Sequence, residues 1–289
     1  MNQIKEQVMK IVFLIAACTS VLAVALICIF LFANGIPAIG EIGVFKFLLG
    51  ELWRPSNNLY GILPMILGSI YVTAGAIILG VPVALFTSVF MARYCPKKIY
   101  PFFQSAINLM AGVPSVVYGF FGLVLIVPMI QSATGRDGST MLAASVLLAI
   151  MILPTIIGVT ESSLRSVPES YYEGSLALGA THERSIFFTI IPAAKSGIVA
   201  GIVLGIGRAV GETMAVIMVA GNQARMPARM PAGLFRGVRT LTANIVLEMG
   251  YAADLHREAL IATGVVLFVF ILLINLAVSL LNRRTHYGD

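Results

Sequence analysis

The stretch Tyr172-Glu173-Gly174-Ser175-Leu176-Ala177-Leu178-Gly179-Ala180 decides the fold, because it is a polar, charged segment enclosed by long apolar sequence. Pro168, with an acidic residue after it, favours the first turn of a helix. Gly179 can adopt the left-handed conformation that ends a helix, and Pro192 suits the start of the next one. The loop from about 161 to 194 is therefore expected to be an ordered helix–glycine–helix that a soluble partner can bind.

The composition of the chain places this loop in a membrane protein. Of the 289 residues, 58% are hydrophobic and only 11% are charged, whereas a soluble domain carries about 25% charged residues. Roughly 20 apolar residues cross a bilayer as a helix, which satisfies its own backbone polar groups in lipid. Charge-free stretches occur at 11–33, 55–92, 99–135, 138–160 and 259–282, and one further apolar stretch is interrupted only by Arg208 and Glu212.

The expected architecture is all-α and polytopic, with six transmembrane helices in a single membrane domain over residues 1–289. We place the spans at about 11–33, 61–92, 103–133, 139–160, 195–221 and 259–282, with the polar loop at about 161–194. Basic residues in the 93–98 loop and near both chain ends favour cytoplasmic termini, and so a cytoplasmic polar loop. Outside the spans we expect a short interfacial helix over 44–49 and Trp53 at headgroup level.

Arg208 and Glu212 are the charged pair within the fifth span. A charge at mid-membrane costs about 2.5–3.5 kcal/mol, so such side chains face protein or water and usually find a partner. At a spacing of four residues they share one helix face and can form a structural ion pair. Alternatively, the guanidinium of Arg208 binds oxyanion oxygens as a step on a transport route. Both interpretations remain open.

The third span is expected to break at Gly112-Val113-Pro114-Ser115, because Pro114 disfavours helical geometry at Val113 and removes a donor. A half-helix that starts near Pro114 would turn its positive end toward an anion at the midplane, although a proline kink that serves only packing fits equally well. In the fifth span, small residues at four-residue spacing predict close helix packing: Gly197, Gly201, Gly205 and Ala209.

The polar loop resembles the EAA motif of binding-protein-dependent ABC importer permeases. The matching residues are Glu173-Gly174-Ser175, then Gly179 at the family's distance, then Thr189-Ile190-Ile191-Pro192. The chain departs from the motif at Gly174, Ser175, Thr189 and Ile191. Without this resemblance, the loop would also fit an ordinary amphipathic connector.

Three further stretches resemble the PstC family of phosphate-importer permeases: 53–69, 111–119 and 207–215. The resemblance implies a type I ABC importer permease (MetI-like) fold in the inner membrane of a prokaryote. It implies ATPase coupling through Glu173, Gly174, Ser175, Gly179, Ala180 and Pro192. The translocation path is expected to include Gly112, Pro114, Ser115, Arg208, Glu212 and Thr213.

The same resemblance implies partner proteins, and it implies that no cofactor or nucleic acid is bound. The chain is expected to form the path with a homologous PstA-like permease, to contact two copies of a cytoplasmic PstB-like ATPase, and to receive phosphate from an extracytoplasmic PstS-like binding protein. It would bind no cofactor, ATP would be hydrolysed on the partner subunits, and no nucleic acid is involved. In the outer segment 222–257, the repeat 224–227 and 228–231 contributes two of five arginines. This positive segment either helps to dock the receptor or attract anions, or is a solvated linker.

Two alternatives remain beside a phosphate permease. The chain could serve another oxyanion, such as sulfate or molybdate, or act as a secondary carrier with Arg208 and Glu212 as an ion-coupling pair. The sequence contains no Gly-x-x-x-x-Gly-Lys-[Ser/Thr] loop for ATP. It also lacks the Gly-x-Ser-x-Gly and His-Glu-x-x-His motifs of hydrolases, so covalent catalysis by this chain is not expected.

Overall fold

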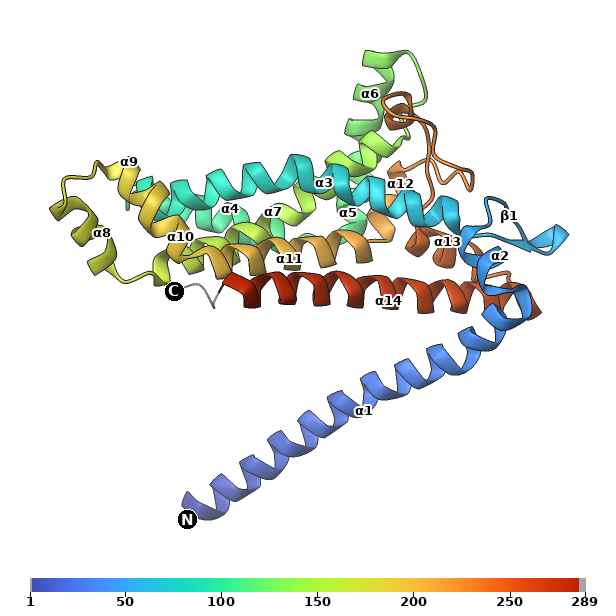
Figure 1. The fold of residues 1–289 in the computed structure, drawn as a ribbon, viewed down its shortest axis with the longest axis horizontal. Helices are drawn as coiled ribbons and strands as arrows, with labels where there is room; N and C mark the ends of the chain where they lie inside the picture. The colour runs from blue at the N-terminus through green and yellow to red at the C-terminus, as the bar shows by residue number, and fades with distance from the viewer. Residues whose placement is uncertain (1, 286–289) are drawn as a thin grey trace.

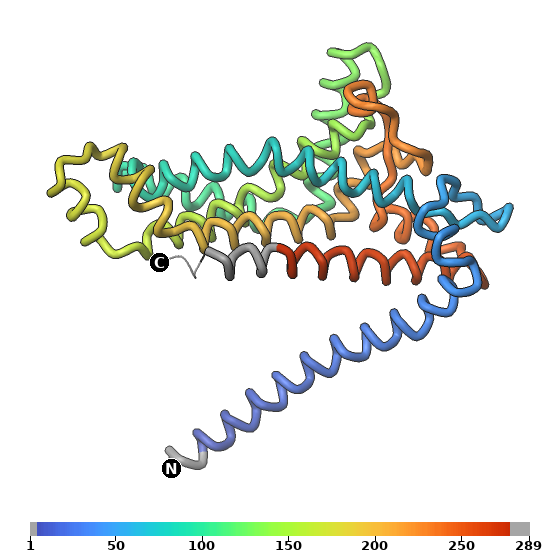
Figure 2. The backbone as a smooth tube through the Cα atoms, in the orientation of Figure 1, coloured from blue at the N-terminus to red at the C-terminus, as the bar shows by residue number. Residues whose placement is uncertain are grey.

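The computed structural model describes residues 2–285, and the body of the molecule is helical (Figures 1 and 2). This confirms the expected all-α class. Five long helices dominate: α1 (Asn2–Ile42), α3 (Leu63–Val89), α7 (Met141–Ser166), α11 (Lys195–Gly211) and α14 (Asp254–Thr285). The shorter helices are α2 (Val44–Leu49), α4 (Tyr100–Gly112), α5 (Ser115–Phe121), α6 (Val127–Thr134), α8 (Glu169–Ala177), α9 (His182–Ser185), α10 (Ile191–Ala193), α12 (Met214–Val219) and α13 (Leu241–Glu248).

Within the described residues, five helices are long and apolar enough to cross a membrane, and a bent helix pair gives a sixth if its two helices count as one span. The bent pair joins His182–Ala193 to Lys195–Gly211 at an angle of 69°. Five of the six expected spans correspond to these helices with changed boundaries, and the expected span at 195–221 corresponds in part to the bent pair. The first helix extends beyond 11–33 at both ends, and the third and fifth spans are each broken in the middle.

Helix α7 forms the centre of the body, with α3 and α11 packed against it. Its buried side chains are mostly Leu, Ile, Met and Ala. The small residues of α11 permit the close approach: a Cβ added to Gly205 would lie 2.7 Å from the side chain of Ile156, and one added to Gly201 would lie 3.0 Å from Thr160. The predicted role of the glycine stripe in packing is confirmed.

Helix α1 projects away from the body and meets it only near its C-terminal end (Figure 1). There, Phe32 and Phe268 of α14 stack edge to face with ring centroids 5.7 Å apart. Gly35 lies directly against α14, where an added Cβ would clash with Val265. Most of α1 therefore presents an apolar surface that the other described residues do not cover.

The segment after α1 forms a compact cap at one end of the molecule. Helix α2 spans Val44–Leu49, as predicted. The strands β1 (Trp53–Arg54) and β2 (Leu59–Tyr60) pair antiparallel, with Trp53 opposite Tyr60. Trp53, expected at headgroup level, is only 5% exposed, so its ring faces the protein and not the surroundings. Its indole N–H finds a buried acceptor there, described below.

Candidate coupling surface and translocation route

The hairpin of α8 and α9 stands at one end of the molecule, opposite the cap (Figure 1). Helix α8 ends in a Schellman motif: the Gly179 N–H donates to the Leu176 carbonyl at 2.9 Å, and the Ala180 N–H donates to the Ser175 carbonyl at 3.1 Å. Gly179 has φ +85°, the left-handed geometry that favours glycine. The predicted helix end at Gly179 is confirmed.

The second helix of the hairpin begins earlier than Pro192. Thr181 caps α9, with its Oγ1 accepting from the Arg184 N–H at 3.4 Å. Glu183 lies in the first turn, where hydrogen bonds from its own backbone N–H and from Thr181 lower the pKa of its carboxyl. Pro192 lies in the first turn of α10, where its missing N–H is tolerated, shortly before the 69° bend into α11.

One ion pair fixes the base of the hairpin to the turn after α3, and a second lies within the last turns of α7. Arg93, after α3, pairs with Glu169 at 3.2 Å and donates to the Leu164 carbonyl at 2.8 Å. Arg165 pairs with the buried Glu161 at 2.8 Å. Glu161 also accepts from the hydroxyl of Tyr100 at 2.8 Å, and Arg165 donates to the Met91 carbonyl, so that α4, α7 and the turn after α3 all contribute to the support of this loop.

Aromatic and apolar contacts hold the two helices of the hairpin together. The Tyr172 hydroxyl and His182 Nδ1 are 2.7 Å apart, and the His182 ring stacks edge to face on Tyr94 at 4.9 Å. Beneath them lies a small buried cluster: Leu164, Val167, Ile190 and Ala194. The hairpin is therefore an ordered element joined to the body.

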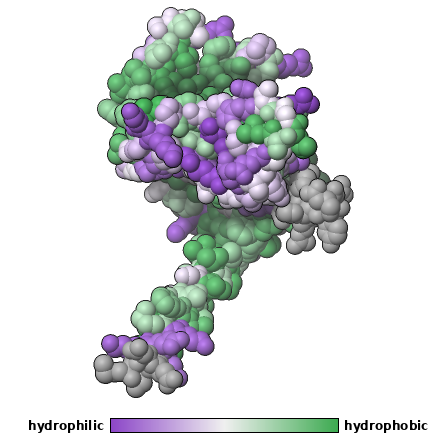
Figure 3. All heavy atoms as spheres, turned by 90° about the vertical axis from the view of Figure 1, so that its left-hand side faces the viewer, coloured by the Kyte–Doolittle hydropathy of each residue, from purple (hydrophilic) through white to green (hydrophobic). Residues whose placement is uncertain are grey.

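The outer surface of the hairpin is exposed in the part of the chain that the structure describes. Glu173 and Gly174 are exposed, and a Cβ added to Gly174 would meet nothing within 4 Å. Leu178 is 91% exposed and Phe188 76% exposed. Figure 3 shows this end of the molecule with many hydrophilic residues across it. These two apolar side chains stand out on an otherwise largely hydrophilic surface. Sequence reasoning did not single out Leu178 or Phe188, because hydropathy cannot separate them from membrane-facing residues.

The candidate route residues lie at two helix breaks. Between α4 and α5, Val113 is extended at ψ 126° and Pro114 precedes the new helix, so the predicted break is confirmed. A second break, which the sequence did not predict, separates α11 from α12 at Glu212 and Thr213.

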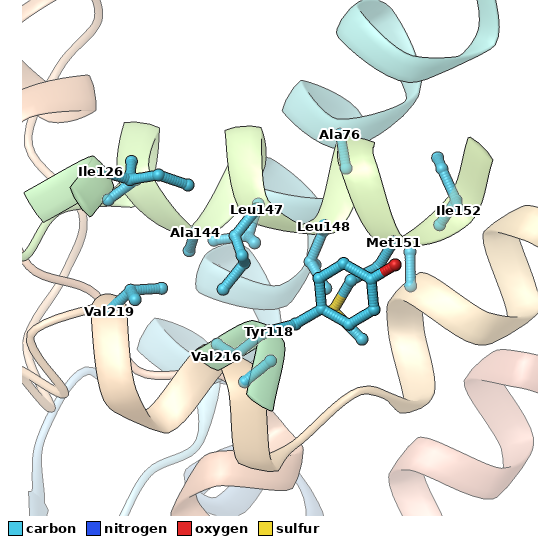
Figure 4. Close-up of a cluster of buried hydrophobic side chains, with 14 of the residues drawn as sticks. Ala76, Tyr118, Ile126, Ala144, Leu147, Leu148, Met151, Ile152, Val216 and Val219 are labelled. Atoms are coloured by element: carbon cyan, nitrogen blue, oxygen red, sulfur yellow. The ribbon is translucent and has the colours of Figure 1, made fainter. Parts of the chain in front are cut away.

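The helices that follow the two breaks pack on each other. A Cβ added to Gly119 of α5 would lie 2.9 Å from the Cα of Ala215 in α12. Figure 4 shows Tyr118 of α5 near Val216 of α12. The Tyr118 hydroxyl reaches back across the first break and donates to the Met110 carbonyl at 2.8 Å. The breaks thus belong to one packed unit, although they are far apart in sequence.

Arg208 and Glu212 do not form the ion pair that their spacing allows. Helix α11 ends at Gly211 and Glu212 is extended, so the two side chains no longer share a helix face. Arg208 instead donates to the Thr155 hydroxyl of α7 at 3.1 Å. Glu212 turns toward α12, where Oε1 accepts from the Ala215 N–H at 3.2 Å. The structural-pair interpretation is wrong for this structure.

The surroundings of these breaks leave room on one side. A Cβ added to Gly112 or to Gly211 would meet nothing within 4 Å. Ser115 and Thr213 are half-buried, and the Thr213 hydroxyl donates to the Gly211 carbonyl at 3.2 Å. Arg208 keeps donors beyond its bond to Thr155, which are of the kind that bind oxyanion oxygens.

At the cap end of the molecule, three side chains contact one buried carboxylate, that of Glu248. Glu248 accepts from Trp53 Nε1 at 2.8 Å, contacts His256 Nε2 at 2.9 Å and pairs with Arg239. Burial raises the pKa of Glu248, but the hydrogen bonds from Trp53, Arg239 and His256 outweigh it and hold the pKa below its ordinary value. Arg239 is therefore a structural residue and not a free docking charge.

A helical membrane body with broken spans and an exposed coupling-type hairpin defines a transporter's membrane subunit. The chain belongs to the binding-protein-dependent transport system inner membrane component family, whose sequence pattern matches residues 80–287. It is a multi-pass membrane protein with the fold of type I ABC importer permeases.

Named relatives cover most of the chain. It is 35% identical to the probable ABC transporter permease protein YqgH of Bacillus subtilis, over 94% of this chain and 89% of that protein. It is 32% identical to the phosphate transport system permease protein PstC of Mesorhizobium japonicum, over 86% of this chain and 81% of that protein.

Solved structures share the fold at low sequence identity. An inward-facing MetNI methionine ABC transporter matches with a TM-score of 0.63 and 20% identity, over 81% of this chain and 99% of that one. A bacterial ABC transporter involved in alginate import matches with a TM-score of 0.61 and 15% identity, over 93% of this chain and 95% of that one.

Proposed function

We propose that this chain is a permease subunit of an ATP-driven phosphate importer. The observation that carries the proposal is the hairpin with Glu173 exposed at its surface, in a chain similar over most of its length to a phosphate permease. By this proposal a homologous permease completes the path, and two copies of a separate ATPase bind the hairpin. Phosphate arrives on a receptor outside the membrane. Both termini and the hairpin face the cytoplasm, where ATP is available.

Coupling in this proposal is mechanical. Closure of the ATPases on ATP displaces the hairpin through Glu173, Gly174, Ser175, Gly179, Ala180 and Pro192. The displaced hairpin shifts the permease toward its outward-open state, and hydrolysis resets it. ATP stays on the partner subunits, and this chain supplies no catalytic group.

Within the membrane, the proposed path follows the open side of the two helix breaks. Arg208 offers a guanidinium to phosphate oxygens, while Gly112, Pro114, Ser115, Glu212 and Thr213 shape the opening beside it. The uncovered apolar length of α1 supports the same proposal, because it can lie against lipid and the second permease.

Reconstitution tests this function directly. The chain, a second permease and the ATPase are placed in proteoliposomes with phosphate-loaded receptor, and uptake of radioactive phosphate is followed with and without ATP. We expect uptake only when all components and ATP are present. Uptake by this chain alone under an ion gradient would establish the secondary-carrier alternative. Equal uptake of sulfate with its own receptor would establish the other oxyanion.

A further inference from the structure

A basic pocket of about 450 Å³ lies where the turn after α6 meets the segment that follows α12. It is on the half of the molecule away from the coupling hairpin (Figure 1). Three arginines contribute to its wall, Arg136 from the turn and Arg225 and Arg236 from the long segment. The remaining lining includes Asp137, Gln223 and Phe235.

The walls of this pocket are held by contacts that do not use the side chains of its three lining arginines. The Arg236 carbonyl accepts from the Met141 N–H at 2.9 Å, which ties the segment to the start of α7. The Val238 N–H donates to the Ala220 carbonyl at 2.9 Å, and Arg239 Nε donates to the Asn222 carbonyl at 3.0 Å. The pocket is therefore present before any partner binds, which lowers the entropic cost of binding.

The charges of the pocket are not neutralised within the part of the chain that the structure describes. Arg136, Arg225 and Arg236 are exposed and form no ion pair with any residue in that part. Asp137 is the one acidic side chain in the lining, so three guanidinium groups outnumber it. Such a site attracts carboxylate or phosphate oxygens, which guanidinium groups bind with two parallel hydrogen bonds.

The lining favours a protein over a free ion. Phe235 offers a half-buried aromatic ring, and the combination of arginine and aromatic side chains is typical of protein–protein interfaces. An inorganic anion would make no use of the ring. The family of this chain is binding-protein-dependent, and a related alginate transporter structure contains a periplasmic protein. Charge complementarity would also steer a soluble partner to this surface.

We propose that the pocket of Arg136, Arg225 and Arg236 receives an acidic side chain of the phosphate receptor and so fixes where the receptor docks. This inference rests on the proposed function. The tandem repeat of the segment provides a matched comparison: Arg225 and Arg229 occupy the same position in Ala-Arg-Met-Pro, but only Arg225 lines the pocket.

The test measures receptor binding to the reconstituted complex in nanodiscs, in low and high salt. Arg225→Glu and Arg236→Glu are each expected to weaken receptor binding by at least about tenfold in low salt, and by less in high salt. Arg229→Glu is expected to stay within about twofold of the parent. ATPase activity without receptor is expected to be unchanged in all three variants, which shows that they fold and assemble. An Asp→Lys or Glu→Lys change on the receptor that restores binding to Arg225→Glu would identify the paired residue.

Several results would overturn the inference. Receptor binding that is equal in Arg225→Glu, Arg236→Glu and the parent would do so. So would saturable binding of inorganic phosphate alone that Arg225→Glu abolishes, because the pocket would then be an anion site. If receptor binding required acidic lipid in the nanodisc, and Arg225→Glu and Arg236→Glu both abolished that requirement, the pocket would be assigned to contact with the membrane surface. Failure of the parent complex to take up phosphate while it still binds the receptor through these arginines would contradict the proposed function and leave the docking pocket intact.

Discussion

The indole N–H of Trp53 donates to Glu248 Oε2 at 2.8 Å, across 195 positions of sequence. This bond joins the strand after α2 to the end of α13, and His256 of α14 contacts the same carboxylate oxygen. A buried hydrogen bond to a charged group contributes about 1.5–3 kcal/mol. The cap of the molecule therefore depends on one carboxylate.

Removal of this carboxylate should destabilise the protein strongly. Glu248→Ala leaves Arg239 buried without its carboxylate partner and is expected to cost about 3–5 kcal/mol. Trp53→Phe keeps an aromatic ring and should cost about 1.5–3 kcal/mol. Thermal unfolding in detergent measures both. Glu258→Gln, at an exposed position of α14, is the matched control and should melt like the parent. Parent-like melting of Glu248→Ala would show that the cluster adds nothing to stability.

The same carboxylate predicts a pH dependence. Because the folded pKa of Glu248 lies below its ordinary value near 4.5, its contribution to stability is complete above about pH 4.5. The contribution is lost as the pH falls through the lower, folded-state pKa. Melting temperature plotted against pH should therefore decrease more steeply at acid pH for the parent than for Glu248→Gln. Parallel curves for the two proteins would contradict this assignment.

Arg208→Gln should separate transport from assembly. Loss of a charge-assisted contact to phosphate is expected to lower uptake by at least about tenfold, while assembly and ATP hydrolysis persist. Thr155→Val removes the hydroxyl that positions the guanidinium and should give a smaller decrease. Normal uptake by an assembled, ATP-hydrolysing Arg208→Gln transporter would exclude Arg208 from the path.

Glu212 can be tested for two different roles. Glutamine at this position retains an oxygen that can accept from the Ala215 N–H, so Glu212→Gln should keep the start of α12, whereas Glu212→Ala should lose it. If the carboxylate serves only to cap α12, uptake by Glu212→Gln equals that of the parent. We expect a decrease in Glu212→Ala, because the start of α12 beside the proposed path is lost, and uptake near that of the parent in Glu212→Gln. Melting temperatures distinguish loss of the hydrogen bond that caps α12 from loss of the negative charge of Glu212.

The hairpin offers a matched pair of glycines. At Gly179, φ is +85°, so Gly179→Ala should cost about 1–2 kcal/mol and distort the end of α8. Gly174 is helical and exposed with open space around it, so Gly174→Ala should be tolerated or slightly stabilising. We expect receptor-stimulated ATPase activity to decrease only in Gly179→Ala. Equal activity of both variants would show that coupling does not require the Schellman end of α8.

The sequence predicted features that depend on neighbours along the chain. The helix over 44–49, the left-handed Gly179 and the break at Pro114 follow from local backbone chemistry, and all three are present. The packing of α11 through its glycines followed in the same way from spacing alone. The assignment of the path and coupling residues to their functions remains a prediction.

Features that depend on distant partners were not predictable. Trp is a residue type that anchors proteins at lipid headgroups, so nothing in the sequence indicates that Trp53 is buried. Only its hydrogen bond to Glu248 explains the burial. In the sequence, Arg239 is indistinguishable from the other arginines of its segment; the structure shows that it donates to Glu248 of α13. The spacing of Arg208 and Glu212 implied a pair, because nothing local marks the end of α11 at Gly211. Long-range acceptors and helix breaks are set by tertiary packing, which a single sequence does not display.

The 69° bend before α11 has a consequence for the distant guanidinium. From Lys195 to Arg208 the helix rises about 20 Å, so a tilt of about 5° at its base displaces the far end by roughly 2 Å. That displacement is enough to break the 3.1 Å bond between Arg208 and Thr155. Under the proposed function, a small displacement of the hairpin would thus free the guanidinium to bind phosphate, with α11 transmitting the motion as a rigid lever.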